Sequence, residues 1–124
     1  MHLVHEPGEG HHLVRRVGDD FVQVADRRFT ESFLLAPNAC EEHFPAHDVG
    51  SFGDAAVDAV LALEPALVLI GTGPRQHLAP PTLMAAFLTR GIGIEAMDSA
   101  AAARTFNLLA GEGRRVVAAF LLPP

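Results

Sequence analysis

The chain has 124 residues, 49% hydrophobic and 19% charged, with a formal net charge of −6 at pH 7. This length and composition suit one globular domain with a single core, and they exclude a second full domain and an intrinsically disordered chain. The acidic balance argues against a nucleic-acid-binding protein, because phosphate contacts require a basic surface.

The sequence contains one cysteine, Cys40, which cannot form an internal disulfide. No apolar run approaches the roughly 20 residues that span a bilayer, so we expect no integral membrane segment. The N-terminus lacks both a secretory signal and an Arg-rich transit pattern. We therefore expect a soluble protein, cytoplasmic if its source is bacterial.

Residues 1–11 are polar and without period, which predicts a loose terminus. Four histidines fall at or beside it: His2, His5, His11 and His12. Their clustering is compatible with a metal site, but no carboxylate or thiolate ligands lie nearby at a recognisable spacing. We expect a histidine-bearing tail and no bound metal.

The next part of the chain is β-like. Runs rich in Val and Phe occupy residues 13–17, 21–25 and 29–36, and Asp and Gly separate the first two. This pattern predicts two or three antiparallel strands in a hairpin or meander. Residues 37–50 are expected to form a connection, which makes the carboxylates and histidines at 41–43 and 47–48 a solvated surface loop.

A helix is expected over residues 51–63, opened by a capping box of Ser51 and Asp54 and stopped by Pro65. Its apolar positions have helical spacing. They are Phe52, Ala56, Val60 and Leu63.

After Pro65, expected strands and helices alternate. Residues 66–70 are apolar at every position, which is typical of a strand covered on both faces. Pro80 and Pro81 open a helix that ends before Gly91. Its expected apolar stripe is Leu83, Met84, Phe87 and Leu88.

A short strand over 92–96 follows, then a helix over 99–110 capped by Asp98, and a last strand over 114–122. Helices between strands imply crossover connections. The predicted fold class is therefore α/β, with three layers, a mixed central sheet, flanking helices and an additional N-terminal hairpin or meander.

The sequence Gly71-Thr72-Gly73 follows the apolar strand, as in a phosphate-binding turn. A dinucleotide fingerprint needs a third glycine three residues later, and Gln76 stands there. The Gly-Lys-Ser/Thr of a P-loop is absent as well. We therefore expect no nucleotide cofactor.

Position still makes the turn a candidate site, because open α/β sheets bind ligands beyond the carboxyl ends of their strands. If the two strands are neighbours, Thr72, Arg75, Glu95 and Asp98 line one crevice. The alternative is structural: the glycines permit a tight positive-φ turn, Arg75 is solvated and Asp98 only caps a helix.

Two further candidates, Arg104 and Asn107, stand three residues apart on one predicted helix and can share a face. Asn107 either binds a ligand or partner, or bonds a neighbouring backbone group; the second reading is favoured. No Gly-x-Ser-x-Gly or His-Glu-x-x-His motif occurs, so no catalytic residue is assigned.

Residues 67–124 contain a series of motifs in a fixed order: the strand with its Gly-x-Gly turn, Arg90-Gly91-Ile92, Glu95-Ala96-Met97-Asp98, the run over 103–109, and Glu112-Gly113-Arg114. An earlier stretch, residues 29–37, reads FTESFLLAP. Together these two stretches resemble the Mth938-like proteins, the DUF498 family. The resemblance implies a three-layer fold with a mixed sheet.

The family includes the mitochondrial complex I assembly factor 3, whose members help to build respiratory complex I with a partner assembly factor. The resemblance implies a non-enzymatic binding or assembly protein that contacts complex I subunits or another assembly factor. The alternative is an anion-binding protein or unassigned enzyme with its crevice at residues 71–75 and 95–98. A homodimer through an exposed strand edge is a further expectation.

Overall fold

The computed structural model describes residues 3–5 and 12–124, and of residues 3–5 only the backbone. Its larger sheet has the strand order β1-β6-β5-β9-β7-β8. β7 pairs in parallel with both β8 and β9, and the remaining pairs are antiparallel, so the sheet is mixed. The strands are β1 Leu3–His5, β5 Phe33–Ala36, β6 Ala39–Glu41, β7 Leu67–Gly71, β8 Gly93–Met97 and β9 Val116–Phe120.

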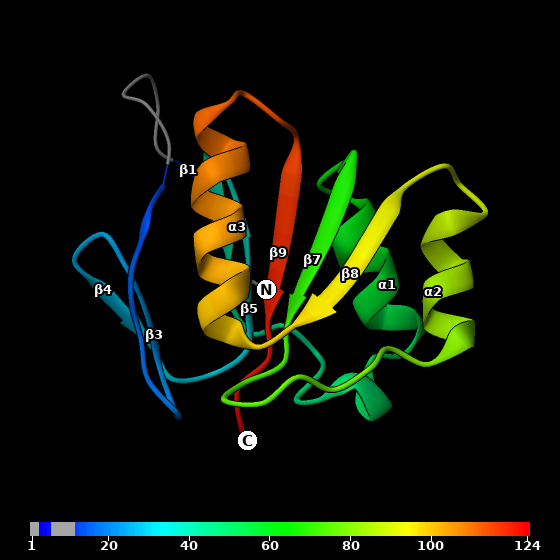
Figure 1. The fold of residues 1–124 in the computed structure, drawn as a ribbon, viewed down its shortest axis with the longest axis horizontal. Coiled ribbons are helices and arrows are strands. Elements are labelled where there is room, and N and C mark those ends of the chain that lie inside the picture. The colour runs from blue at the N-terminus through cyan, green and yellow to red at the C-terminus, as the bar shows by residue number, and fades with distance from the viewer. Residues whose placement is uncertain (1–2, 6–11) are drawn as a thin grey trace.

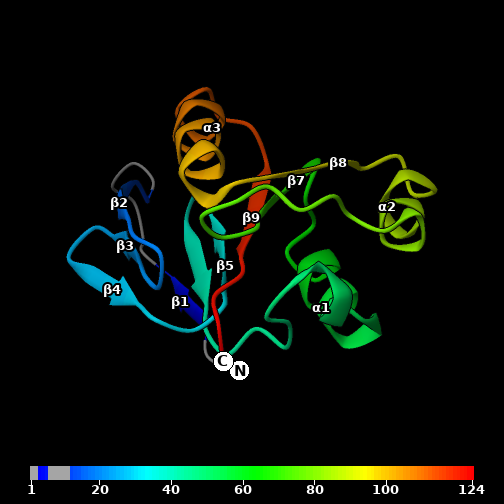
Figure 2. The same cartoon turned by 60° about the horizontal axis from the view of Figure 1, so that its bottom comes forward.

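A second, antiparallel sheet has the order β2-β3-β4. Together with helix α3 it lies on one face of the large sheet, and helices α1 and α2 cover the other face (Figures 1 and 2). The bounds are β2 Val14–Val17, β3 Val22–Val24, β4 Arg27–Phe29, the 3-10 helix η1 Val49–Ser51, α1 Asp54–Leu61, α2 Pro81–Leu88 and α3 Ser99–Gly111. The predicted α/β class with three layers and additional N-terminal β-structure is confirmed.

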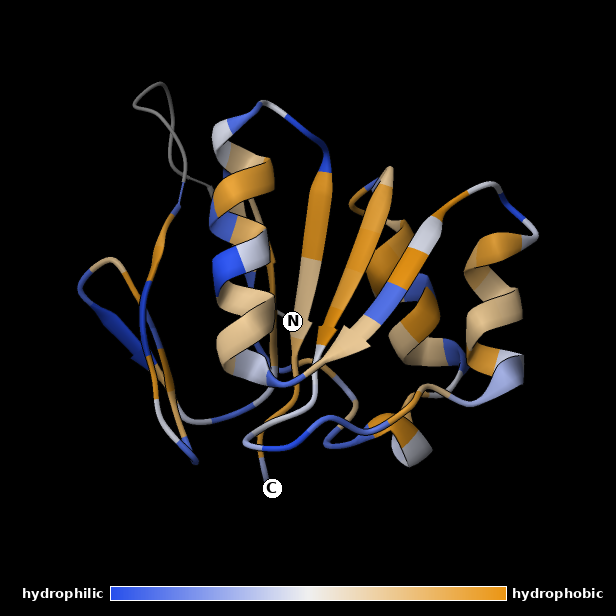
Figure 3. Ribbon diagram, viewed as in Figure 1, coloured by the Kyte–Doolittle hydropathy of each residue, from blue (hydrophilic) through white to orange (hydrophobic). Residues whose placement is uncertain are grey.

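The large sheet separates two apolar cores. Along β9 and the residues after it, 116, 118, 120 and 122 point to the core that contains α3, whereas 117, 119 and 121 point to the core of α1 and α2. Successive side chains of a strand face opposite sides, so burial on both sides requires apolar residues throughout. Figure 3 shows this continuous hydrophobic colour on β7 and β9.

The expected elements of the C-terminal half are confirmed within a few residues. Pro81 takes the first position of α2, and Gly91 has a φ of 73° after its end. The predicted apolar stripe of α2 was wrong at one position. Leu88 is 54% exposed, whereas Leu83 and Phe87 are buried as expected.

The N-terminal half required three corrections. Residues 29–36 are not one strand, because the chain leaves the small sheet after Phe29 and enters the large sheet at Phe33. The expected connection at 37–50 contains strand β6. Within the expected loose terminus, residues 3–5 form β1 and pair with β6, while His2 and His11 lie outside the described residues.

The predicted capping box was also wrong. The Asp48 carboxylate accepts from Ser51 N at 2.8 Å, and Ser51 Oγ accepts from Asp48 N at 3.2 Å, so the box belongs to η1. Helix α1 starts later, with Gly53 as its N-cap and no side-chain bond. The phenyl ring of Phe44, in the chain between β6 and η1, is buried and meets Phe52 edge to face.

Candidate functional site

The glycine turn and the β8 end lie side by side. β7 and β8 are parallel neighbours in the register Gly71↔Met97 (Figure 1). Parallel strands end at the same edge of a sheet, so residues 71–75 and 95–98 meet there. The adjacency assumed for the candidate crevice is therefore present.

The two glycines of the turn serve different purposes. Gly73 has a φ of 91°, a conformation that side chains with a Cβ rarely adopt. Gly71 is required by close packing, since a Cβ there would lie 2.9 Å from the Phe120 ring and 3.0 Å from Ser99 Oγ. The expected positive-φ turn is thus confirmed at one of the two glycines.

The polar groups of the turn are bonded to the backbone around them. Thr72 Oγ1 lies 2.6 Å from the Arg75 carbonyl oxygen and 3.1 Å from that of Met97, and it accepts from His77 N at 3.2 Å. Gln76 Nε2 donates to the Ala96 carbonyl at 2.9 Å. These bonds fasten the loop after β7 onto the end of β8.

Helix α3 begins at the same place. The Asp98 carboxylate accepts from Ala101 N at 2.8 Å, the N-cap bond expected from the sequence. Gly73 N donates to Ser99 Oγ, and Ser99 N donates to the Gly73 carbonyl, both at 2.8 Å. Asp98 and Ser99 therefore hold the helix start against the turn.

Arg75 and Glu95 are exposed, and neither has a side-chain hydrogen bond or ion pair within residues 12–124. Of the four residues proposed to line the crevice, Thr72 and Asp98 use their side chains internally. Ligand binding at this crevice stays a prediction, with Arg75 as its available cation.

Arg104 and Asn107 lie on the side of α3 that faces the small sheet, away from the glycine turn. Asn107 Oδ1 accepts from Val14 N and Asn107 Nδ2 donates to the Val14 carbonyl, both at 2.9 Å. The side-chain amide thus takes the place that a neighbouring strand would have beside β2. Arg104 is exposed and lines a cavity with Arg15 and Arg16 of β2.

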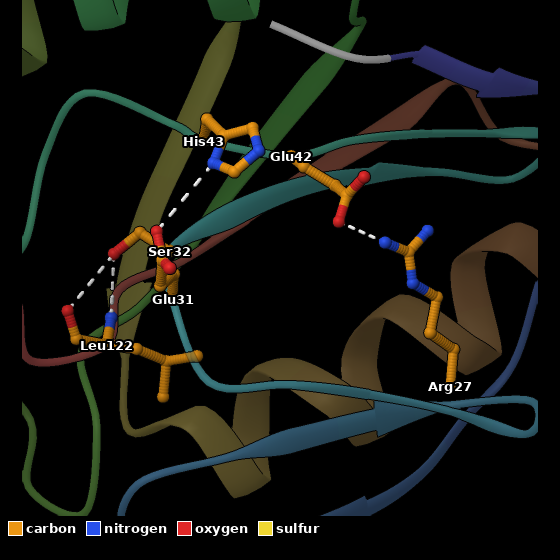
Figure 4. A network of polar contacts seen from close by, with 6 residues as sticks. All are labelled: Arg27, Glu31, Ser32, Glu42, His43 and Leu122. Atoms are coloured by element: carbon orange, nitrogen blue, oxygen red, sulfur yellow. Dashed lines mark hydrogen bonds and ion pairs between the residues drawn. The ribbon is translucent and has the colours of Figure 1, made fainter.

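A second polar network was not anticipated from the sequence (Figure 4). Ser32 is buried, and its Oγ accepts from Leu122 N at 2.8 Å and lies 3.2 Å from the Leu122 carbonyl. It continues the β5-β9 pairing beyond the last paired residues. Nearby, Arg27 forms an ion pair with Glu42, and His43 Nδ1 lies 3.7 Å from Glu31 Oε1.

The expectation that residues 41–43 form a solvated surface loop holds only in part. Glu41 is the last residue of β6, and Glu42 and His43 line a cavity of about 110 Å³ beneath the edge of the small sheet. Among the described residues, no group of three or more His, Cys, Asp or Glu is arranged to hold a metal ion.

Cys40 on β6 is buried between the two sheets. Burial raises the pKa of its thiol to about 11, although the neighbouring Arg27 charge opposes the shift. The thiolate is the reactive form of cysteine, so this thiol is a poor nucleophile at neutral pH.

Comparison with known proteins identifies the family. A family model described as a protein of unknown function (DUF498/DUF598) matches residues 14–121. The chain belongs to this family. A solution structure of a Bordetella pertussis protein, described as a Mth938-like domain, has a TM-score of 0.73 and 31% identity, covering 99% of this chain and 92% of that chain.

Similarity to other known proteins extends this result. A Xanthomonas campestris solution structure has a TM-score of 0.82 and 46% identity, covering 90% of this chain and 84% of that chain. The Homo sapiens NADH dehydrogenase (ubiquinone) 1 alpha subcomplex assembly factor 3 is 38% identical over 97 residues, which cover 73% of this chain and 53% of that protein.

A Francisella tularensis relative named 13 kDa major membrane protein is 34% identical over 83 residues, covering 67% of this chain and 68% of that protein. In the described part of this DUF498 chain, no helix has the length and apolar character needed to cross a membrane.

Proposed function

We propose that this DUF498 protein is a non-enzymatic binding or assembly factor for respiratory complex I. The similarity to proteins named complex I assembly factor 3 carries the proposal, with 38% identity to both the human and the Bos taurus proteins. The chain spans about half the length of these assembly factors. Its partners are therefore part of the proposal, namely complex I subunits or another assembly factor.

The geometry of the glycine turn supports a binding role. Side chains of Thr72, Gln76 and Asp98 are bonded to backbone groups, which makes the edge of the sheet rigid. A surface that is ordered before binding loses less conformational entropy in a complex. This edge is suited to present a fixed surface to a protein partner.

The exposed side chains of that edge include Arg75 and Leu78. Leu78 is 81% exposed, the most exposed of the large hydrophobic side chains among the described residues. An arginine beside an exposed aliphatic side chain is a combination that protein interfaces use, with the apolar group at the centre and the charge at the rim. We propose the loop over residues 72–80 as the contact with the assembly partner.

The experiment is an affinity purification from the source organism with the tagged protein at its native level. We expect complex I subunits or an assembly factor to be recovered with the wild-type protein, and at least tenfold less with the double variant Arg75→Ala/Leu78→Ala. The matched control is Leu88→Ala, which truncates an exposed leucine on α2.

The control should recover as much partner as the wild type. Recovery of the tagged protein alone would contradict the assembly role. Equal recovery by the double variant and the wild type would leave the role intact and refute the loop as its surface.

The place of action belongs to the same proposal. We infer that the protein works in the cytoplasm, where it meets complex I subunits before or during their insertion. Fractionation of the source organism tests this: the protein should be found in the cytoplasmic fraction, and its recovery only with washed membranes would contradict the assignment.

A further inference from the structure

A basic groove lies between strand β2 and one face of helix α3. Its volume is about 220 Å³, and its walls include Arg15 and Arg16 from β2 and Arg104 from α3. Ala100 and Ala103 form part of the helix side. No carboxylate is among the described residues that line this groove, although the whole chain has a net charge of −6.

A β-bulge brings the two strand arginines to the same side. The register steps from Val14↔Val24 to Arg16↔Gln23, so two positions of β2 oppose one position of β3. In a regular strand neighbouring side chains face opposite sides, and a bulge changes that alternation. Val14 and Val17 accordingly both pack toward the core, while Arg15 and Arg16 are both exposed and line the groove.

The opposite wall is fixed by Asn107. Its amide forms both bonds to the Val14 backbone, which holds α3 at a set distance from β2. Arg104 stands one turn earlier on the same face of the helix. The small side chains of Ala100 and Ala103 leave the space beside it open.

The arginines of the groove form no ion pair with any carboxylate of residues 12–124. No ion pair involves Arg15, Arg16 or Arg104 there, in contrast to Arg27, which pairs with Glu42. Three like charges around one hollow repel one another, and an anion between them removes that repulsion. Guanidinium groups bind phosphate oxygens through pairs of parallel hydrogen bonds.

We propose that the groove formed by Arg15, Arg16 and Arg104 binds a phosphate-bearing anion. A space of 220 Å³ is far above the roughly 10–15 Å³ that one water needs, so it admits a phosphoryl group with part of the molecule that carries it. The phosphoryl group belongs either to a free phosphate compound or to a lipid headgroup. This site is separate from the glycine turn and does not depend on the assembly role.

The experiment uses the full chain and two probes. Pyrophosphate is titrated while backbone amide shifts are followed by NMR, and sedimentation is measured with phosphatidylcholine vesicles with and without phosphatidic acid. The test variant is Arg15→Ala/Arg104→Ala. The control is Arg114→Ala/Arg115→Ala, which removes the same charge from another exposed arginine pair whose nearest cavity includes Glu64.

We expect pyrophosphate to shift amides of β2 and of the first half of α3, with affinity at least about tenfold weaker in the test variant and unchanged in the control. Binding only to phosphatidic acid vesicles, with the same loss, supports the site and identifies a lipid headgroup. The proposal is overturned if the protein binds neither pyrophosphate nor phosphatidic acid vesicles. It is also overturned if both variants bind equally more weakly than the wild type, because that result indicates general charge attraction. Thermal unfolding of each variant verifies that it is folded.

Discussion

Replacing Asn107 by alanine tests the bond between helix α3 and the small sheet. The change removes two hydrogen bonds of 2.9 Å to the Val14 backbone. Each hydrogen bond contributes about 0.5–1.5 kcal/mol to stability, which gives about 1–3 kcal/mol for the pair. Alanine favours a helix over asparagine by up to about 0.7 kcal/mol. The expected net loss is about 1.5 kcal/mol.

The assay is urea unfolding at pH 7, together with hydrogen exchange of the Val14 amide. In the Asn107→Ala variant we expect a lower midpoint, an unchanged slope and faster exchange at Val14, because this amide loses its acceptor. The control is Leu108→Ala on the same helix, a side chain that is 63% exposed. It should unfold within about 0.5 kcal/mol of the wild type, as surface substitutions usually do.

Two results would refute the reasoning. Stability of Asn107→Ala equal to that of the Leu108→Ala control would show that the amide contributes nothing to the fold. Unchanged exchange at Val14 would show that its N–H does not depend on Asn107. Unchanged stability with lost partner binding would instead support the alternative of a binding residue.

Three further outcomes follow from the structure. Gly71→Ala should lose about 1–3 kcal/mol by overpacking against Phe120, whereas Gly50→Ala, whose new Cβ would meet only Asp48 Oδ1 at an ordinary 3.5 Å, should lose far less; equal urea midpoints would contradict this. The Cys40 thiol, with its pKa raised by burial from 9.0 to about 11, should react with iodoacetamide at pH 8 about 100-fold more slowly than in urea-unfolded protein. The folded state holds the Cys40 thiol proton more tightly than the unfolded state does. The resulting contribution to the free energy of unfolding is present below pH 9 and is lost as the pH rises through 11. Stability that rises over this pH range would contradict the raised pKa. For the glycine turn, a phosphate, nucleotide or carboxylate that raises the melting temperature of the wild type but not of Arg75→Ala would support the crevice, and a shift that Arg75→Ala retains would count against it.

The C-terminal half could be predicted from the sequence because its signals are local. Residues 66–70 are apolar throughout, Pro81 and Gly91 mark the two ends of a helix, and Asp98 caps the next one. Each signal depends on backbone chemistry within a few residues, which the sequence states directly. The parallel pairing of β7 and β8 follows from the helix between them.

The N-terminal half could not be predicted as well, because the deciding interactions are distant in the sequence. Ser32 bonds to Leu122, 90 residues away, and this contact lies where the chain passes between the two sheets. Two overlapping capping boxes are possible around Ser51, one with Asp48 and one with Asp54, and the structure contains the first. A pattern of apolar residues does not show to which sheet a strand belongs.

The candidate site was predicted in part. The sequence placed residues 71–75 beside 95–98 only if their two strands are neighbours, and the parallel register of β7 and β8 meets that condition. The partner of Asn107 is 93 residues away, so no spacing could identify it. The same holds for the basic groove, where a bulge at Arg15 and a helix nearly 90 residues later supply the charges.

The most direct test of the assembly role is made in the source organism. The gene is deleted, and the amount and NADH:quinone activity of assembled complex I are measured in its membranes. We expect a clear deficit that the wild-type gene and the Leu88→Ala control restore, and that Arg75→Ala/Leu78→Ala does not. Normal amounts of active complex I in the deletion strain would contradict the assembly role.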